Sequence, residues 1–166
     1  MANPKAALIM GSDSDFDKIK GCITKLKEFK IDCEVRVISA HRTPAKAMEY
    51  AANAEENGIE IIICAAGMAA HLAGVIAANT TVPVIGIPIE STFSGMDALL
   101  ATVQMPPGIP VATVGLNNGT NAAILAAEIL ALKYDYIRPI LKSARKAMAD
   151  GVAKKDAAIQ ERVLAL

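Results

Sequence analysis

The chain has 166 residues, of which 53% are apolar and 4% aromatic, and its 17 lysines and arginines are balanced by 17 aspartates and glutamates. This length is typical of one domain with a full hydrophobic core. The zero net charge argues against nucleic acid or an anionic membrane as a partner, because both attract basic patches. Small apolar residues are abundant, which is consistent with contacts between subunits.

Apolar runs and helical periodicities alternate along the chain. A first strand is expected at residues 6–10, and an amphipathic helix follows it. Further strands are expected at residues 33–38, 59–64, 82–87 and 111–114, and further helices at residues 44–57, 95–104, 121–133 and from residue 137 onward. This alternation predicts an α/β fold, in which helices cover both sides of a five-stranded parallel sheet and an extra helix lies at the C-terminus.

The stretch of residues 61–78 is apolar apart from His71 and is long enough to suggest a membrane helix. Gly67 and Gly74 interrupt it, and neither an aromatic belt nor a cationic cluster flanks it. A buried strand, a Gly/Ala loop and a short helix are therefore predicted, without membrane association.

Cys22, Cys33 and Cys64 lack the CxxC spacing of metal sites, and each lies in an apolar run. We therefore expect core thiols in a reducing compartment and no metal site. The first residues contain no apolar signal-peptide core, so a cytoplasmic protein is expected.

Both histidines of the chain follow predicted strands. His41 stands beside Arg42 in the sequence SAHRTP, residues 39–44, where Thr43 is expected to be a helix N-cap and Pro44 the first helical residue. His71 lies in a second strand-to-helix turn. Since parallel strands end at one edge of the sheet, both histidines can approach one crevice there. A loop histidine is more often an ordinary surface residue, but its pKa near neutrality suits acid/base chemistry.

The sequence GSDSD, residues 11–15, offers hydroxyls and backbone N–H groups at the start of a helix, which suits a phosphate. The alternative is a plain capped helix start. The loop matches neither a Walker A loop nor GxGxxG. Residues 90–95 form either a lid or a long connection, and the sequence leaves both open.

Four segments together resemble the N5-carboxyaminoimidazole ribonucleotide mutases, the catalytic subunit of phosphoribosylaminoimidazole carboxylase in purine biosynthesis. They are GSDSD at 11–15, SAHRTP at 39–44, the loop at 66–72, and QMP with GIPV between residues 104 and 111. The resemblance covers about residues 8–132. It implies a flavodoxin-like three-layer fold, a homo-octamer and no metal or organic cofactor. With the length and the predicted elements, we expect one catalytic domain over residues 1–166, with a core at about 6–133 and a helical extension at about 135–166.

The same resemblance assigns roles to residues. His41 would be the catalytic acid/base, Arg42 would contact the substrate phosphate, and Ser12 and Asp15, with Ser14 between them, would bind the ribose phosphate part. The small pocket for carbon dioxide would be walled by Ser39, Ala40, Gly67, Met68, Ala70, His71 and Leu72. The commonest family loop reads GGAAHLPG, whereas this chain has Met68 for the second glycine and Ala73 for the proline. These departures concern efficiency more than the type of reaction.

The reaction implied moves a carboxylate from an exocyclic nitrogen to ring carbon C4, giving 4-carboxy-5-aminoimidazole ribonucleotide on the route to IMP. Protonation of the nitrogen assists loss of carbon dioxide, and its recapture by C4 leaves a proton to remove. One histidine can do both. A transient contact with the ATP-dependent carboxylase that makes the substrate is a further expected partnership.

Two other functions remain open. A second type of the family carboxylates aminoimidazole ribonucleotide directly with carbon dioxide, but its motifs have lysine after the loop histidine and lack His-Leu in the Gly/Ala loop. Arg42 and the pair His71-Leu72 favour the mutase. A non-catalytic ribonucleotide-binding module on the same fold is the other possibility, and such a module has no need of His41.

Overall fold

The computed structural model describes residues 3–166, so the prediction about the N-terminus falls partly outside the described residues. Its centre is a five-stranded sheet in the order β2-β1-β3-β4-β5, in which all paired strands are parallel. The strands are β1 (Lys5–Met10), β2 (Asp32–Val37), β3 (Ile59–Gly67), β4 (Val84–Ile89) and β5 (Ala112–Thr113). This is the doubly wound order of flavodoxin-like proteins, so the predicted fold class is confirmed.

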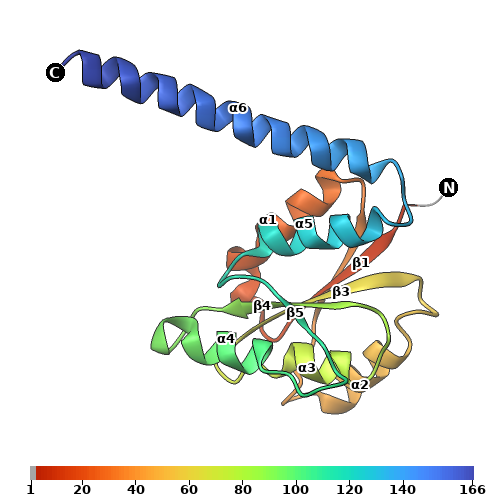
Figure 1. Ribbon diagram of the computed structural model, residues 1–166. Helices are drawn as coiled ribbons and strands as arrows, with labels where there is room; N and C mark the ends of the chain where they lie inside the picture. Colours follow the sequence, from red (N-terminus) through yellow and green to blue (C-terminus); the bar gives the residue numbers. More distant parts are fainter. Residues whose placement is uncertain (1–2) are drawn as a thin grey trace.

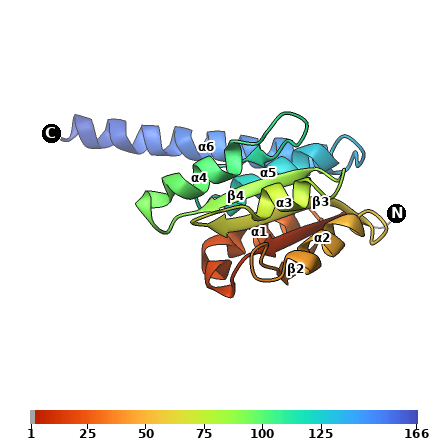
Figure 2. The same cartoon turned by 90° about the horizontal axis from the view of Figure 1, so that it is seen from below.

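Helices cover both faces of the sheet, as Figures 1 and 2 show. On one face lie α1 (Phe16–Glu28), α5 (Gly119–Leu130) and the first part of α6 (Ile137–Leu164), and on the other lie α2 (Pro44–Ala52), α3 (Leu72–Ala77) and α4 (Met96–Val103). Two short 3-10 helices, η1 (Asp13–Asp15) and η2 (Phe93–Gly95), precede α1 and α4.

The apolar stretch that resembles a membrane helix is divided between β3 and α3. Along β3, Ile61 and Ile63 pack in the core on one side of the sheet and Ile62 packs in the core on the other. A central parallel strand is buried on both faces, which explains its unbroken apolar sequence. Among residues 3–166, no helix is both long and apolar enough to span a bilayer.

The largest differences from the sequence predictions are at the ends of elements. The helix predicted at residues 44–57 ends at Ala52, and turns lead to Gly58, whose φ of +72° suits glycine. The strand predicted at 82–87 lies at Val84–Ile89, where it pairs with β3 from Ile62 to Gly67. Pro83 stands just before it, and its carbonyl accepts the N–H of Ile62 at 3.0 Å. These shifts leave the order of the elements unchanged.

Gly86 allows α4 to pack closely against β4. A Cβ at this position would overlap Cγ2 of the buried Thr102 and lie 3.1 Å from Cγ1 of Val111. We expect Gly86→Ala to lower the free energy of unfolding by roughly 1–3 kcal/mol, the usual range for overpacking. Urea unfolding measures this. Gly115→Ala is the matched control, because a Cβ there meets no atom within 4 Å. Equal midpoints for the two variants would contradict the prediction.

Candidate functional site

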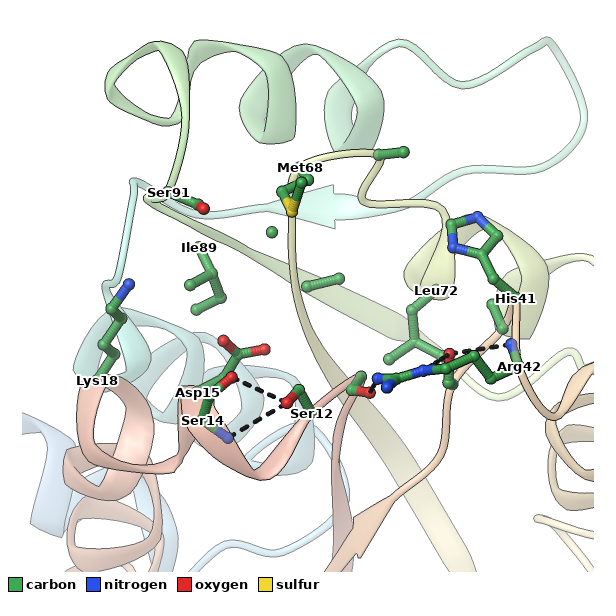
Figure 3. A pocket seen from close by; sticks show the side chains of 16 residues that line it. Ser12, Ser14, Asp15, Lys18, His41, Arg42, Met68, Leu72, Ile89 and Ser91 are labelled. Atoms are coloured by element: carbon green, nitrogen blue, oxygen red, sulfur yellow. Dashed lines mark hydrogen bonds between the residues drawn. The ribbon is translucent and has the colours of Figure 1, made fainter.

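A cavity of about 670 Å³ opens at the carboxyl edge of the sheet. It lies over β1 and β3, between which the strand order reverses, and this is where doubly wound sheets bind ligands. Figure 3 shows the side chains around it. The lining residues come from the ends of four strands and the segments after them: Gly11, Ser12, Ser14, Asp15, Lys18, Ser39, Ala40, His41, Arg42, Ala66, Gly67, Met68, Ala69, Leu72, Ile89 and Ser91.

The loop after β1 is a capped helix start and also a wall of the cavity. Ser12 is the N-cap of η1, and its Oγ accepts the backbone N–H of Ser14 at 3.3 Å and the hydroxyl of Ser14 at 2.8 Å. Asp15 precedes α1 without a side-chain capping bond and lines the cavity. Burial raises the pKa of its carboxyl above the ordinary value, and the nearby charge of Lys18 opposes that rise.

The turn after β2 is held together by two hydrogen bonds between Thr43 and Ser39, which the sequence did not predict. Thr43 is the N-cap of α2 and Pro44 is its first residue, as predicted, but the side chain of Thr43 makes no capping bond. Its hydroxyl instead donates to the carbonyl of Ser39 at 2.9 Å and accepts the N–H of Ser39 at 3.1 Å. This reciprocal pair fixes the turn that carries His41 and Arg42.

Arg42 is held across the cavity floor. Ser39 Oγ accepts the backbone N–H of Arg42 at 3.1 Å and its Nε at 3.4 Å, while Nη2 donates to the carbonyl of Gly11 at 3.0 Å. All these acceptors are neutral, and within residues 3–166 no carboxylate lies within ion-pair distance of Arg42. Its charge is therefore available to an anion beside Ser12.

The two histidines meet at the same edge, as their places in the sequence predicted. Nε2 of His41 lies 2.8 Å from Nδ1 of His71, and the rings stand edge to face with their centroids 4.9 Å apart. One of the two facing nitrogens donates the proton of this hydrogen bond and the other accepts it, so the tautomers of the two rings are linked. His41 lines the cavity, whereas His71 lies behind His41 and is not one of the residues that line the cavity.

The end of β3, the loop that follows and the start of α3 place Gly67, Met68 and Leu72 on the cavity. A Cβ on Gly67 would come within 3.1 Å of the carbonyl of Ile89, so the close approach of β4 favours glycine. Met68 is 57% exposed with φ of +55°, a conformation that costs a side chain about 1–2 kcal/mol and glycine nothing. Ala70, by contrast, is 1% exposed and outside the lining, so it supports the loop from within.

Comparison with known proteins identifies the family. The family model described as AIR carboxylase matches residues 5–151. The chain belongs to the AIR carboxylase family. A relative from Pyrococcus abyssi (strain GE5 / Orsay), named N5-carboxyaminoimidazole ribonucleotide mutase, is 57% identical over 146 residues, which is 87% of this chain and 84% of that protein. A Thermotoga maritima protein of the same name is 52% identical over 153 residues, covering 92% of this chain and 90% of its own.

Solved structures agree with this membership of the AIR carboxylase family. The crystal structure of Treponema denticola PurE has a TM-score of 0.84 and 29% identity, covering 93% of this chain and 98% of that one. A second crystal structure from Treponema denticola, of a PurE2 variant, gives the same TM-score of 0.84 at 28% identity, with 93% and 97% covered. The family resemblance drawn from the four sequence segments is confirmed.

In this member of the AIR carboxylase family, Gly11, Ala66 and Ala69 also line the cavity, and they lie in segments that the sequence had singled out. Ile89, Lys18 and Ser91 line it as well, and no role in the site was predicted for these three from the sequence. Helical spacing provided a signal for Lys18, because it lies three residues after Asp15 and so on the same side of α1. Ser91 lies in the segment of residues 90–95, which the sequence identified only as either a lid or a long connection.

The cysteines have the character predicted from the sequence. Cys22 and Cys64 are buried and Cys33 is half-buried, and none forms a disulfide. Burial raises the pKa of Cys22 to about 12 and that of Cys33 to about 11, so both remain protonated thiols at neutral pH. Among residues 3–166, His, Cys, Asp and Glu side chains form no group of three or more that could hold a metal ion.

Proposed function

We propose that this chain is an N5-carboxyaminoimidazole ribonucleotide mutase, which transfers a carboxylate from the exocyclic nitrogen of its substrate to ring carbon C4 in purine biosynthesis. The observation that carries the proposal is the convergence of His41, Arg42 and the Ser12–Asp15 loop on one cavity. It occurs in a chain 57% identical over 146 residues to a protein of that name. We further propose one catalytic domain and a cytoplasmic location.

The substrate would lie with its phosphate at Arg42, because a guanidinium makes charge-assisted bonds to phosphate oxygens. Ser12, Ser14 and Asp15 would bind the ribose phosphate part from the floor of the cavity. Ser39, Ala40, Gly67, Met68 and Leu72 would wall the space for carbon dioxide, and all five line the cavity. His71 would act through its contact with His41, and Ala70 through packing beneath the loop.

His41 would carry one proton between two positions on the substrate. It protonates the exocyclic nitrogen as the N–C bond of the carbamate breaks and carbon dioxide leaves. C4 then attacks carbon dioxide, and His41 removes the C4 proton, which restores the aromatic ring and the protonated histidine. A side chain that titrates near neutrality can donate and accept in turn, whereas an ordinary carboxylate is a poor donor at pH 7.

Carbon dioxide must stay beside C4 between these two steps. The end of β3 and the loop after it offer small residues there, since Ala66, Gly67 and Ala69 line the cavity together with Leu72. Such a surface offers few polar groups to water and leaves room for a small apolar molecule. Holding the molecule at the reacting carbon makes recapture effectively intramolecular.

Direct carboxylation of aminoimidazole ribonucleotide remains the second candidate, and one assay separates the two. Purified protein is incubated with N5-carboxyaminoimidazole ribonucleotide in carbon-dioxide-depleted buffer, and formation of the C4-carboxylated product is followed. A mutase forms product at a rate independent of added bicarbonate. Product formation only from aminoimidazole ribonucleotide with bicarbonate would establish the carboxylase instead, and no turnover of either would indicate a binding module.

We also propose a homo-oligomer, and an octamer by family resemblance, in which α6 packs against a neighbouring subunit. The first turns of α6 pack on α5 through Ile137 and Leu141, but the helix then extends beyond the rest of the molecule (Figure 1). Its outer part carries exposed apolar side chains at helical spacing: Met148, Val152, Ile159 and Val163. Contact with the carboxylase that makes the substrate remains a hypothesis from the resemblance alone.

Light scattering tests the assembly. At micromolar concentration the expected mass is a multiple of 17.3 kDa, because the apolar stripe of α6 is buried between subunits. Val152→Glu combined with Ile159→Glu should lower the mass, whereas Lys154→Glu, a change at an exposed position on another side of α6, should not. A wild-type mass near that of one chain would refute the proposal.

A further inference from the structure

Lys18 is a cavity residue to which neither the family resemblance nor the proposed mechanism gives a role. It lies in the first turn of α1, three residues after Asp15, and both side chains line the cavity. Figure 3 shows Lys18 and Ser91 on the side of the cavity away from Arg42. Its Nζ donates to the carbonyl oxygen of Glu90 at 2.5 Å, which ties α1 to the segment after β4.

The ammonium group of Lys18 retains donors for a ligand. It has three N–H bonds, of which the carbonyl of Glu90 takes one. Five other lysines form ion pairs, but within residues 3–166 no carboxylate lies within 4 Å of Lys18. The carboxylate of Glu90 itself accepts a hydrogen bond from Asn117 at 3.2 Å. Lys18 therefore presents its charge to the cavity without a fixed anionic partner.

Asp15 and Lys18 are complementary in hydrogen bonding. An ionised carboxylate only accepts and an ammonium only donates, while a hydroxyl does both. Two neighbouring hydroxyls placed against the pair can donate to Asp15 and accept from Lys18 at the same time. Arg42 lies at the other side of the cavity, so a phosphate bound there leaves this edge to the sugar (Figure 3).

We propose that Lys18 is a specificity-determining residue, which together with Asp15 binds the 2′,3′-diol of the substrate ribose. The inference rests on the proposed ribonucleotide substrate and adds a donor at the edge of the site away from the phosphate. A site built to hydrogen-bond a hydroxyl discriminates against ligands that lack it. Lys18 therefore makes the protein selective for ribonucleotides over their deoxy counterparts.

The test compares aminoimidazole ribonucleotide with its 2′,3′-dideoxyribo analogue in titration calorimetry. In Lys18→Met we expect affinity for the ribonucleotide to fall about tenfold, the scale of one hydrogen bond to a charged group, with little change for the analogue. Lys18→Arg should retain most of the discrimination. Lys20→Met is the control, since Lys20 lies on the same helix in an exposed ion pair with Asp17. In turnover, Lys18→Met should raise KM and leave kcat within about twofold.

A pH profile adds an independent signature. Burial raises the pKa of Asp15 above its ordinary value, and the charge of Lys18 limits that rise. Removing that charge raises the pKa of Asp15 further. As the pH is lowered, Asp15 should therefore become protonated, and ribonucleotide binding should be lost, at a higher pH in Lys18→Met than in wild type or Lys18→Arg. Equal losses for both ligands, or unchanged discrimination, would overturn the inference. If wild type binds ribonucleotide but does not convert it, only the mutase proposal fails.

Discussion

Replacement of His41 by asparagine is expected to lower turnover by about 10²-fold or more while leaving folding, assembly and ribonucleotide binding intact. This loss is the usual scale of general acid–base catalysis, and asparagine cannot carry a proton at neutral pH. His41 is exposed at the cavity, so its removal leaves the hydrophobic core unchanged. The measurements are kcat with N5-carboxyaminoimidazole ribonucleotide, light scattering, and calorimetric titration with aminoimidazole ribonucleotide.

The matched control is His71→Asn. Nδ1 of His71 lies 2.8 Å from Nε2 of His41, but His71 does not line the cavity. Its loss should therefore reduce activity only in part, through the orientation of the His41 ring. Equal losses in the two variants would mean that the pair carries the proton jointly. Weaker binding of ribonucleotide in His41→Asn, with turnover unchanged at saturation, would make His41 a binding residue, and loss of the oligomer would make it structural.

Arg42→Ala is expected to weaken ribonucleotide binding by about thirty- to hundred-fold. That corresponds to roughly 2–3 kcal/mol, the contribution of a charge-assisted contact with phosphate. The substitution also removes the bonds from the guanidinium to Gly11 and Ser39, so part of the effect comes from loss of order in the cavity floor. Calorimetric titration with aminoimidazole ribonucleotide measures the change.

Arg42→Lys separates charge from geometry. Lysine keeps the positive charge but lacks the planar fork, so we expect an intermediate affinity. The phosphate itself is tested with the dephosphorylated nucleoside, which should bind wild type and Arg42→Ala with similarly low affinity. Unchanged ribonucleotide binding by Arg42→Ala would remove this residue from the site.

The order of the elements could be predicted from hydrophobic periodicity, because β3 is apolar throughout and the helices carry one apolar face. The residues at which the elements end could not be predicted in this way. No local signal in the sequence indicates that the helix from Pro44 should stop at Ala52, since the residues that follow permit helix and the turns depend on packing of Ala54 against the sheet. At β4 the two-residue shift follows from the pairing of Ile62 with Val84, a contact between distant segments.

The sequence predicted which residues belong to the candidate site better than it predicted the contacts between them. His41, Arg42, Ser12 and Asp15 carried recognisable chemistry in strand-to-helix turns, and they line one cavity. The direct contact between the two histidines depends on the relative placement of the β2 and β3 ends, and spacing along the chain cannot supply it. The sequence also could not predict that the hydroxyl of Thr43 bonds to the carbonyl of Ser39. A threonine before a proline looks the same in a sequence whether its hydroxyl caps the helix or, as here, bonds within the preceding turn.

Exchange of the C4 proton of bound aminoimidazole ribonucleotide with deuterated solvent tests most directly whether His41 is the proton carrier. In deuterium oxide, NMR of the C4 proton should show its loss in the presence of wild-type protein, because His41 would protonate and deprotonate that carbon. The His41→Asn variant should bind the nucleotide and leave the signal intact. Equal exchange in the presence of both proteins would contradict the assignment of His41 as the acid/base.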